Sequence, residues 1–418
     1  MTRRFLFPPT LLVASALLAS SALLTTPVFA NPALPPETAV REALEAHPAV
    51  QAAVNRIAGA KADQRILKAG SHELVFAGSY VRRSVDREGR YDEYDATLSR
   101  AFRLPGKARL DRTAGELGLI AAENLAEDAR HQIALRLNEL WWDWVEASAE
   151  AAVDQAGVGN YRATLTAVQR RVELRDAPQL EADQAAAALG DAQALAAQSQ
   201  GRADLARARL AAQFPGLPLP VDAPEPPSPA LPLEGLATLR DQVIARSHEI
   251  AAADAEAGRL AALADRAARD RLADPTVGVR LFSERGGAER GAGLVFSMPL
   301  GSGARGGMAA KVAAEAQAAS AELAAVRLDV QETADADRTE AEAAFTAWRF
   351  AREALGAQSA ALGKLRRGQQ LGAIDLSEVL LGERLTHLAF RTEAKARADA
   401  SRKLSRLLID SHNLWISD

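Results

Sequence analysis

The chain has no cysteine among its 418 residues. This excludes disulfides, thiolate metal sites and a lipidated N-terminal cysteine. After Ala30 no run of 18 consecutive apolar residues occurs, so we expect no transmembrane helix. A secreted chain without such a helix can still cross a membrane as a β-barrel. Basic residues are not in excess either, since 50 Lys+Arg stand against 54 Asp+Glu, and this argues against nucleic-acid binding.

Residues 1–30 have the pattern of a secretory signal peptide. Arg3 and Arg4 precede an apolar run from about Leu11 to Leu24, and a small-residue cleavage site ends at Ala30. We therefore expect a mature chain that begins at Asn31, carries no lipid and has a net charge of −6 instead of −4. An uncleaved membrane anchor is the alternative. The choice between the general and the twin-arginine export route stays open, because the twin-arginine motif is imperfect.

Between residues 94 and 112 the sequence changes from the alternating pattern of a strand to the composition of a helix, and the rest of the chain is organised around this junction. Apolar and polar residues alternate from Tyr94 to Leu104, which predicts a strand with one apolar face. Pro105 and Gly106 end the strand, and no proline follows until Pro178. The residues in between are mostly good helix formers, so we predict a helix to about residue 172, roughly 100 Å long. A second strand-to-helix junction, with Pro299 and Gly301, follows the segment that begins at residue 294.

The chain consists of two versions of one unit. The first repeat, 31–213, is predicted to contain a helix over 37–69 interrupted near Pro48, strands over 72–83 and 91–104, the long helix, and a returning helix over 179–213. Residues 214–232 carry eight prolines and form an extended connector. The second repeat, 233–418, is predicted to contain a helix over 236–272, strands over 275–283 and 288–300, and helices over 304–368 and 375–409. A shift of 196 positions aligns the two helical turns.

The first long helix carries a heptad seam for packing against another helix. Three tryptophans lie in the same part of the helix and are interpreted as core residues, with a membrane-interface belt as the alternative. The seam residues are Ile133, Leu137, Leu140, Trp144, Ala147 and Ala151, and the other two tryptophans are Trp141 and Trp142.

Four strands of about 9–13 residues suit tilted crossings of a bilayer. Four strands cannot close a barrel, and an open edge in lipid leaves backbone groups unpaired. We therefore expect three copies to form a 12-stranded barrel continuous with an α-helical tube. The fold class is mainly α with a membrane β-barrel portion. The residues expected to face lipid are Ala96, Leu98, Phe102, Ala292, Leu294, Phe296 and Met298.

The mature sequence resembles the TolC-like outer membrane efflux family. The resemblance is carried by the segments 43–48 (ALEAHP), 105–109 (PGKAR), 297–301 (SMPLG) and 372–380 (GAIDLSEVL). The run 104–109 (LPGKAR) looks most like the branch of CzcC-type channels for heavy-metal cations. The resemblance implies a homotrimer in the outer membrane with a large periplasmic portion, a periplasmic adaptor protein and an inner-membrane pump of the RND type. No arrangement of a nucleophile and a base stands out in the sequence, so we expect no enzymatic activity and no cofactor.

The resemblance also implies that the two helical turns close the pore at the periplasmic end. Glu378 occupies the position of an acidic gate residue, whereas Leu381 and Ile374 depart from the acidic and basic residues of many relatives. The alternative is that these polar residues are solvated and cap helix ends. The gate or tip residues of this hypothesis are Glu378, Asp375, Gly372, Asp176 and Pro178.

The sequence does not identify the exported cargo. The six histidines have no three- or four-residue spacing typical of a helical metal site, so we expect no resident metal. The glycine-rich run 301–307 lacks the Gly-Lys-Ser/Thr end of a phosphate loop. Type I protein secretion or efflux of small organic compounds are alternatives to metal export. A periplasmic coiled-coil scaffold or adaptor is the alternative from another class, but it leaves the two proline-terminated hairpins unexplained.

Overall fold

The computed structural model describes residues 33–301 and 303–416. The predicted signal peptide therefore lies outside the described residues. The same order of elements occurs twice, helix pair, hairpin, long helix and returning helix. The first set is α1 (Glu37–Ala46), α2 (Pro48–Ala69), β1 (Leu74–Val85), β2 (Gly89–Ala101), α3 (Lys107–Glu173) and α4 (Gln179–Gln213). The second set is α5 (Leu236–Ala245), α6 (His248–Arg269), β3 (Thr276–Glu284), the 3₁₀ turn η1 (Arg285–Gly287), β4 (Glu289–Ser297), α7 (Gly303–Gln370) and α8 (Leu376–Asp410).

Short local signals set where the helices begin. Pro48 occupies the first position of α2, where its missing N–H removes no helical hydrogen bond. The side chain of His47 accepts a hydrogen bond from the Ala49 N–H, at 3.2 Å. In the second half Ser247 caps α6 by accepting from the Ile250 N–H, at 3.2 Å. Each predicted first helix is therefore two helices separated by a break.

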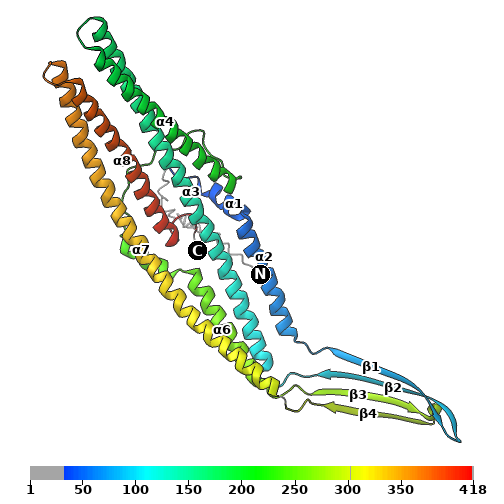
Figure 1. Ribbon diagram of the computed structural model, residues 1–418. Helices are drawn as coiled ribbons and strands as arrows, with labels where there is room; N and C mark the ends of the chain where they lie inside the picture. Colours follow the sequence, from blue (N-terminus) through cyan, green and yellow to red (C-terminus); the bar gives the residue numbers. More distant parts are fainter. Residues whose placement is uncertain (1–32, 302, 417–418) are drawn as a thin grey trace, which may run out of the picture.

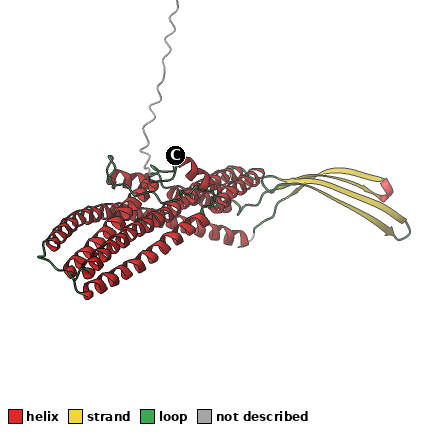
Figure 2. Ribbon diagram, turned by 90° about the horizontal axis from the view of Figure 1, so that it is seen from above, coloured by secondary structure: helices red, strands yellow, loops and turns green. Residues whose placement is uncertain are grey.

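The helices form an elongated body with the sheet at one end and two helical turns at the other (Figures 1 and 2). Next to the sheet, the contacts between helices give the order α2, α3, α6, α7. Beyond the middle of the body the order is α4, α3, α8, α7. The helices α3 and α7, with 67 and 68 residues, run through both halves and are about 100 Å long. None of the helices among the described residues has the length and low polarity needed to cross a membrane.

The largest core cluster lies where α1, α3 and the end of α8 meet the connector. Trp141, Trp142 and Trp144 are all buried in it. The indole of Trp141 donates to the carbonyl of Ala33, and that of Trp142 donates to the hydroxyl of Ser405, both at 2.8 Å. The interpretation of the tryptophans as core residues is confirmed.

One antiparallel sheet contains all four strands in the order β1-β2-β3-β4. The pairing of β2 with β3 joins the two halves of the chain, with Leu98 opposite Val279. The strand ends differ from the prediction, most clearly at β2, which stops at Ala101 instead of residue 104. The reason is that the Leu104 N–H donates to the Asp274 carboxylate at 3.0 Å instead of to a neighbouring strand. At β3, Pro275 cannot donate to a ladder, and β4 correspondingly ends at Ser297.

Candidate functional site

One face of the sheet is an exposed apolar surface. Side chains directly opposite each other in the ladder lie on the same face, so the register assigns each residue to a face. Leu294 is 84% exposed and Phe76 is 72% exposed. We call this surface the apolar sheet face; it contains Leu74, Phe76, Gly78, Tyr80, Tyr94, Ala96, Leu98, Val277, Val279, Leu281, Ala292, Leu294 and Phe296. Contiguous apolar surface of this kind is rare on soluble monomers.

The opposite face is more polar. Arg280 forms an ion pair with Asp95, and Arg83 forms one with Glu93 at 2.7 Å. Small residues are frequent on this face, and at Gly278 a side chain would collide with Ser99 on the neighbouring strand. Apolar and polar side chains therefore alternate along the strands, a pattern typical of a sheet with an apolar medium on one side and water on the other. Along the described residues, β1 and β4 each pair on one side only.

The first strand-to-helix junction is held by buried charges. Pro105 leads into Gly106, whose φ of +86° lets the chain turn into α3. Lys107, the first residue of α3, is 1% exposed. Its ammonium group contacts Asp270 and Asp274, each at 2.8 Å, and donates to the carbonyl of Leu272 at 2.7 Å. The 105–109 segment thus ties the first repeat to the second.

The two aspartates are ionised because of these contacts. Burial disfavours the charged form of Asp274, but Lys107, the Leu104 N–H and His72 outweigh it and lower its pKa. Burial likewise opposes the ionisation of Asp270, and Arg266 and Lys107 lower its pKa. All of these groups lie at the helix ends next to the sheet.

Arg103 completes this junction. Its guanidinium donates to the carbonyls of Leu67, Lys68 and Ala69, which are unpaired at the end of α2. It also binds Asp111 at 2.9 Å. The last turn of α2 is therefore fixed to the beginning of α3.

The second junction has few ties. Gly301 has a φ of +38°, and a side chain built there would meet nothing within 4 Å. Arg305 donates to the carbonyl of Pro299 at 3.4 Å. Among the residues described around Pro299 and Gly301, no buried lysine corresponds to Lys107. The two junctions are alike in sequence but differ in their ionic contacts.

The helical turns at the far end have the same backbone. Arg175 and Gly372 both have positive φ, +60° and +74°. The Asp176 N–H donates to the Arg171 carbonyl, and the Ala373 N–H donates to the Gly368 carbonyl, at 2.8 and 2.9 Å. The structural offset between the turns is therefore 197 positions, and the predicted offset of 196 is wrong by one residue. The prediction aligned Ala177 with Ala373 by identity, whereas the fold aligns the positive-φ positions.

The corrected offset changes which residues correspond. Pro178 and Asp375 both precede the first residue of a returning helix. Glu181 is then the counterpart of Glu378, and Asp176 is not. Arg171 contacts both Glu181 and Asp176, at 3.2 and 3.1 Å. The acidic groups of the first turn are therefore paired with an arginine.

Glu378 is exposed in the first turn of α8. Its backbone N–H donates to the Asp375 carboxylate at 2.9 Å. The Ser377 hydroxyl and this N–H lower the pKa of Asp375, which is thus an N-cap. In the described part of the chain, the Glu378 carboxylate takes part in no hydrogen bond or ion pair. Its charge is available to the solvent.

The face of α8 that carries Glu378 continues as an apolar line. At about 100° per residue, Leu381, Leu385 and Leu388 fall on the same side of the helix as Glu378. All three leucines are exposed or nearly so. The opposite side of α8 faces the connector. This line ends in a single acidic residue next to the turn.

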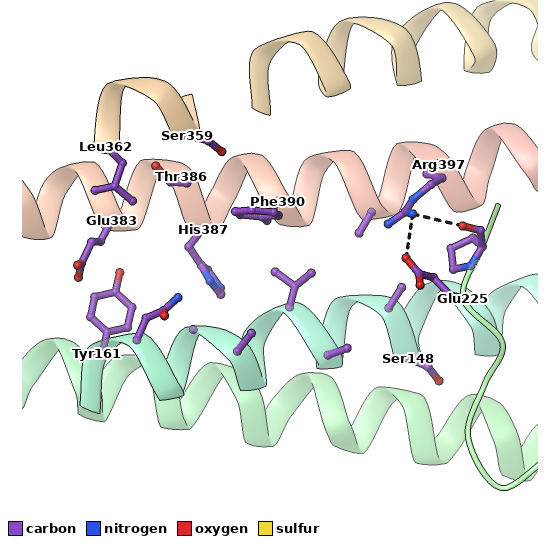
Figure 3. A pocket seen from close by; sticks show the side chains of 18 of the residues that line it. Ser148, Tyr161, Glu225, Ser359, Leu362, Glu383, Thr386, His387, Phe390 and Arg397 are labelled. Carbon is purple, nitrogen blue, oxygen red and sulfur yellow. Dashed lines mark hydrogen bonds and ion pairs between the residues drawn. The ribbon is translucent and has the colours of Figure 1, made fainter. Parts of the chain in front are cut away.

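A cavity of about 760 Å³ lies on the connector side of α8, between α3, α7 and residues 223–226 (Figure 3). Arg397 holds the connector over it by contacting the Glu225 carboxylate and the Pro226 carbonyl, both at 3.3 Å. On its floor His387 contacts the buried Asp154 at 2.8 Å. The sequence contains no local signal for this cavity, because its walls come from four separate segments between residues 148 and 397. Within the described residues no three His, Asp or Glu side chains form a metal-binding group.

No protein-family model matches the sequence, and a search of curated proteins gives no match. Solved structures match over almost the whole chain. The outer membrane protein VceC of Vibrio cholerae is 20% identical, with 90% of this chain and 95% of that chain covered and a TM-score of 0.74. The MtrE outer membrane channel of Neisseria gonorrhoeae, in its open state, is 16% identical, with 91% and 89% covered and a TM-score of 0.70. CusC, for which transmembrane channel formation is described, is 17% identical, with 90% and 91% covered and a TM-score of 0.67. The chain therefore shares the fold of these outer membrane proteins.

Proposed function

We propose that the chain is a TolC-like outer membrane channel and that three copies form its conduit. The observation that carries the proposal is the apolar sheet face, which projects from a helical body about 100 Å long (Figure 1). The shared fold with outer membrane channels supports it. An exposed apolar face is costly in water and favourable in lipid, so the sheet is the membrane portion.

Unpaired strand edges call for further copies of the chain. In lipid, each free backbone group of β1 and β4 costs several kcal/mol by order of magnitude. Pairing β4 of one copy with β1 of the next removes both edges, and three copies give a barrel of 12 strands. The helices form a layer with α7 at one edge and α2 and α4 at the other. The same threefold arrangement closes this layer into a tube.

The elements that lie outside the layer of long helices distinguish the inside of the tube from the outside. The connector, α1 and α5 cover one side of the long helices. On the inner side they would obstruct the conduit, so we assign that side to the exterior. The line of Glu378, Leu381, Leu385 and Leu388 then faces the lumen. Three Glu378 carboxylates near the threefold axis would concentrate cations at the periplasmic mouth.

The proposed partners follow from this assignment. The mature chain after residue 30 lies in the outer membrane and the periplasm, and its helical turns meet a periplasmic adaptor and an inner-membrane pump of the RND type. The LPGKAR segment at 104–109, like that of CzcC-type channels, favours heavy-metal cations as the cargo. The free charge of Glu378 agrees with a cationic cargo. The chain performs no chemistry in this function.

Reconstitution tests the proposal directly. The full chain is purified from membranes and added to a planar lipid bilayer. We expect heat-modifiable trimers and stepwise conductance with a preference for cations over anions. Recovery as a soluble periplasmic protein, with no conductance, would favour the scaffold and refute the channel. A conducting trimer that prefers anions would keep the channel and refute the metal-cation cargo.

A further inference from the structure

Two buried carboxyl groups face each other where α7 meets the end of α8. Asp337 lies on α7, Asp410 is the last residue of α8, and each is 4% exposed. The two groups lie within hydrogen-bonding reach of one another. We call Asp337 and Asp410 the carboxylate pair. A buried pair of this kind is unusual, because ionised carboxylates repel and have no proton to share.

The surroundings offer the pair less positive charge than it needs. Arg406 donates to Asp337 Oδ1 at 2.7 Å and lies 3.6 Å from Asp410 Oδ2. His131 on α3 contacts Asp410 Oδ1 at 2.8 Å. The Oδ2 atoms of both aspartates are buried without a hydrogen-bond donor among the described residues. One proton placed between the two groups would satisfy these oxygens.

The other ionisable groups around the pair carry charges of both signs. Each helix packed here contributes at least one. They are Asp128 and His131 from α3, His248 and Glu249 from α6, Glu340 from α7, Arg406 from α8, and Arg246 and His412 from the segments after α5 and α8. Lys403 binds Glu340 at 2.6 Å, so the charges of these two groups offset each other. Arg406 is the cation shared by the pair.

Burial and the second carboxyl group set the sign of the pH response. Burial and the neighbouring Asp410 raise the pKa of Asp337 to about 7, against the opposing effect of Arg406. A carboxyl group whose pKa is raised by folding stabilises the closed arrangement at low pH. That contribution is lost as the pH rises through the raised value. The contact is therefore strongest in acid, opposite to an ordinary ion pair between a carboxylate and arginine.

We propose that the carboxylate pair is a proton-operated latch that holds the α7–α8 hairpin against α3 and releases it when the shared proton is lost. Three helices meet at the pair, since Asp337 belongs to α7, Asp410 to α8 and its partner His131 to α3. The ring of His131 also meets that of His412, at 5.5 Å between centroids, and His412 stacks on His248 at 5.0 Å. Loosening at the pair thus reaches α6 as well. The latch depends only on helix packing and does not rest on the channel function.

Hydrogen exchange of the full-length protein in detergent tests the latch. The segment 400–412 is followed between pH 5.5 and 8.5, with rates corrected for intrinsic exchange at each pH. An exposed aspartate titrates near pH 4, so linkage predicts that opening of this segment increases about 30-fold over this range. Asp337→Asn keeps the shape and the hydrogen bond but cannot ionise. We expect its protection to be independent of pH and, at pH 8.5, close to that of the wild type at pH 5.5.

Asp335→Asn is the matched control. Asp335 lies two residues away on α7, is half exposed and binds Arg240 at 2.8 Å. This variant should keep the 30-fold pH dependence. Asp410→Asn removes the other carboxyl, one of the two causes of the raised pKa of Asp337, and should reduce the pH dependence. Unchanged protection of the wild type across the range, or a full pH dependence in both pair variants, would overturn the proposal.

Discussion

Replacing Leu294 with arginine tests whether β4 faces lipid or water. Leu294 is 84% exposed and pairs with Val279 in the middle of β4. In water such a side chain has little packing to lose, so Leu294→Arg would change stability by no more than about 0.5 kcal/mol. Near the middle of a bilayer the same change costs about 2–4 kcal/mol. In a trimer all three copies carry the substitution, and the total is about 6–12 kcal/mol.

The assay is urea-driven unfolding of the protein in lipid vesicles, followed by intrinsic fluorescence. A cost of 2–4 kcal/mol lowers the ratio of folded to unfolded chains by about 30- to 900-fold per copy. Val75→Arg is the control, because Val75 is an exposed aliphatic residue at nearly the same depth on the opposite face. We expect the control to lose at most about 1 kcal/mol. Equal losses in the two variants would show that the apolar sheet face does not contact lipid.

Two further variants test the charged groups at the two ends of the helices. Lys107→Ala should cost about 3–5 kcal/mol in urea unfolding, because it leaves Asp270 and Asp274 without their shared cation. Both aspartates have lowered pKa values, so their contribution to the stability of the fold is complete above about pH 4 and is lost as the pH falls through the lowered values. The Lys107→Ala variant should therefore lose less stability in acid than the wild type does. An equal loss in the two proteins would contradict this role of Lys107. Glu378→Ala should weaken cation selectivity and block by divalent ions in planar bilayers, with assembly unchanged. Glu181→Ala is its counterpart and should have little effect; unaltered selectivity in Glu378→Ala would make Glu378 an ordinary solvated residue.

Local sequence signals predicted most of the elements. Pro48 and Pro178 mark helix starts because proline is tolerated only before or in the first turn. Pro105 and Gly106 mark the exit from a strand for a related reason, since proline cannot join a ladder. The observed α4, Gln179–Gln213, agrees with the predicted helix at both ends. These signals act within a few residues, and a single sequence contains them in full.

Contacts over long distances could not be predicted in the same way. Lys107 meets Asp270 and Asp274, and His131 meets Asp410, across more than 160 positions. Nothing in the local composition distinguishes these residues from the many other charged residues of the chain. The histidines also lack helical spacing, yet the fold brings three of them together from α3, α6 and the segment after α8. Sequence spacing describes one helix at a time, whereas these groups meet between helices.

The two repeats share a backbone but differ in how firmly their ends are held. In the first repeat, Lys107 fixes the strand-to-helix junction and Arg171 pairs with the acids of the helical turn. In the second repeat, Gly301 has open space around it and Glu378 has no partner among the described residues. The buried ammonium of Lys107 resists movement, because separating it from its partners would leave an uncompensated buried charge. The α7–α8 hairpin therefore has fewer ionic contacts at its two ends. Between them lies the buried carboxylate pair, the contact that depends on a proton.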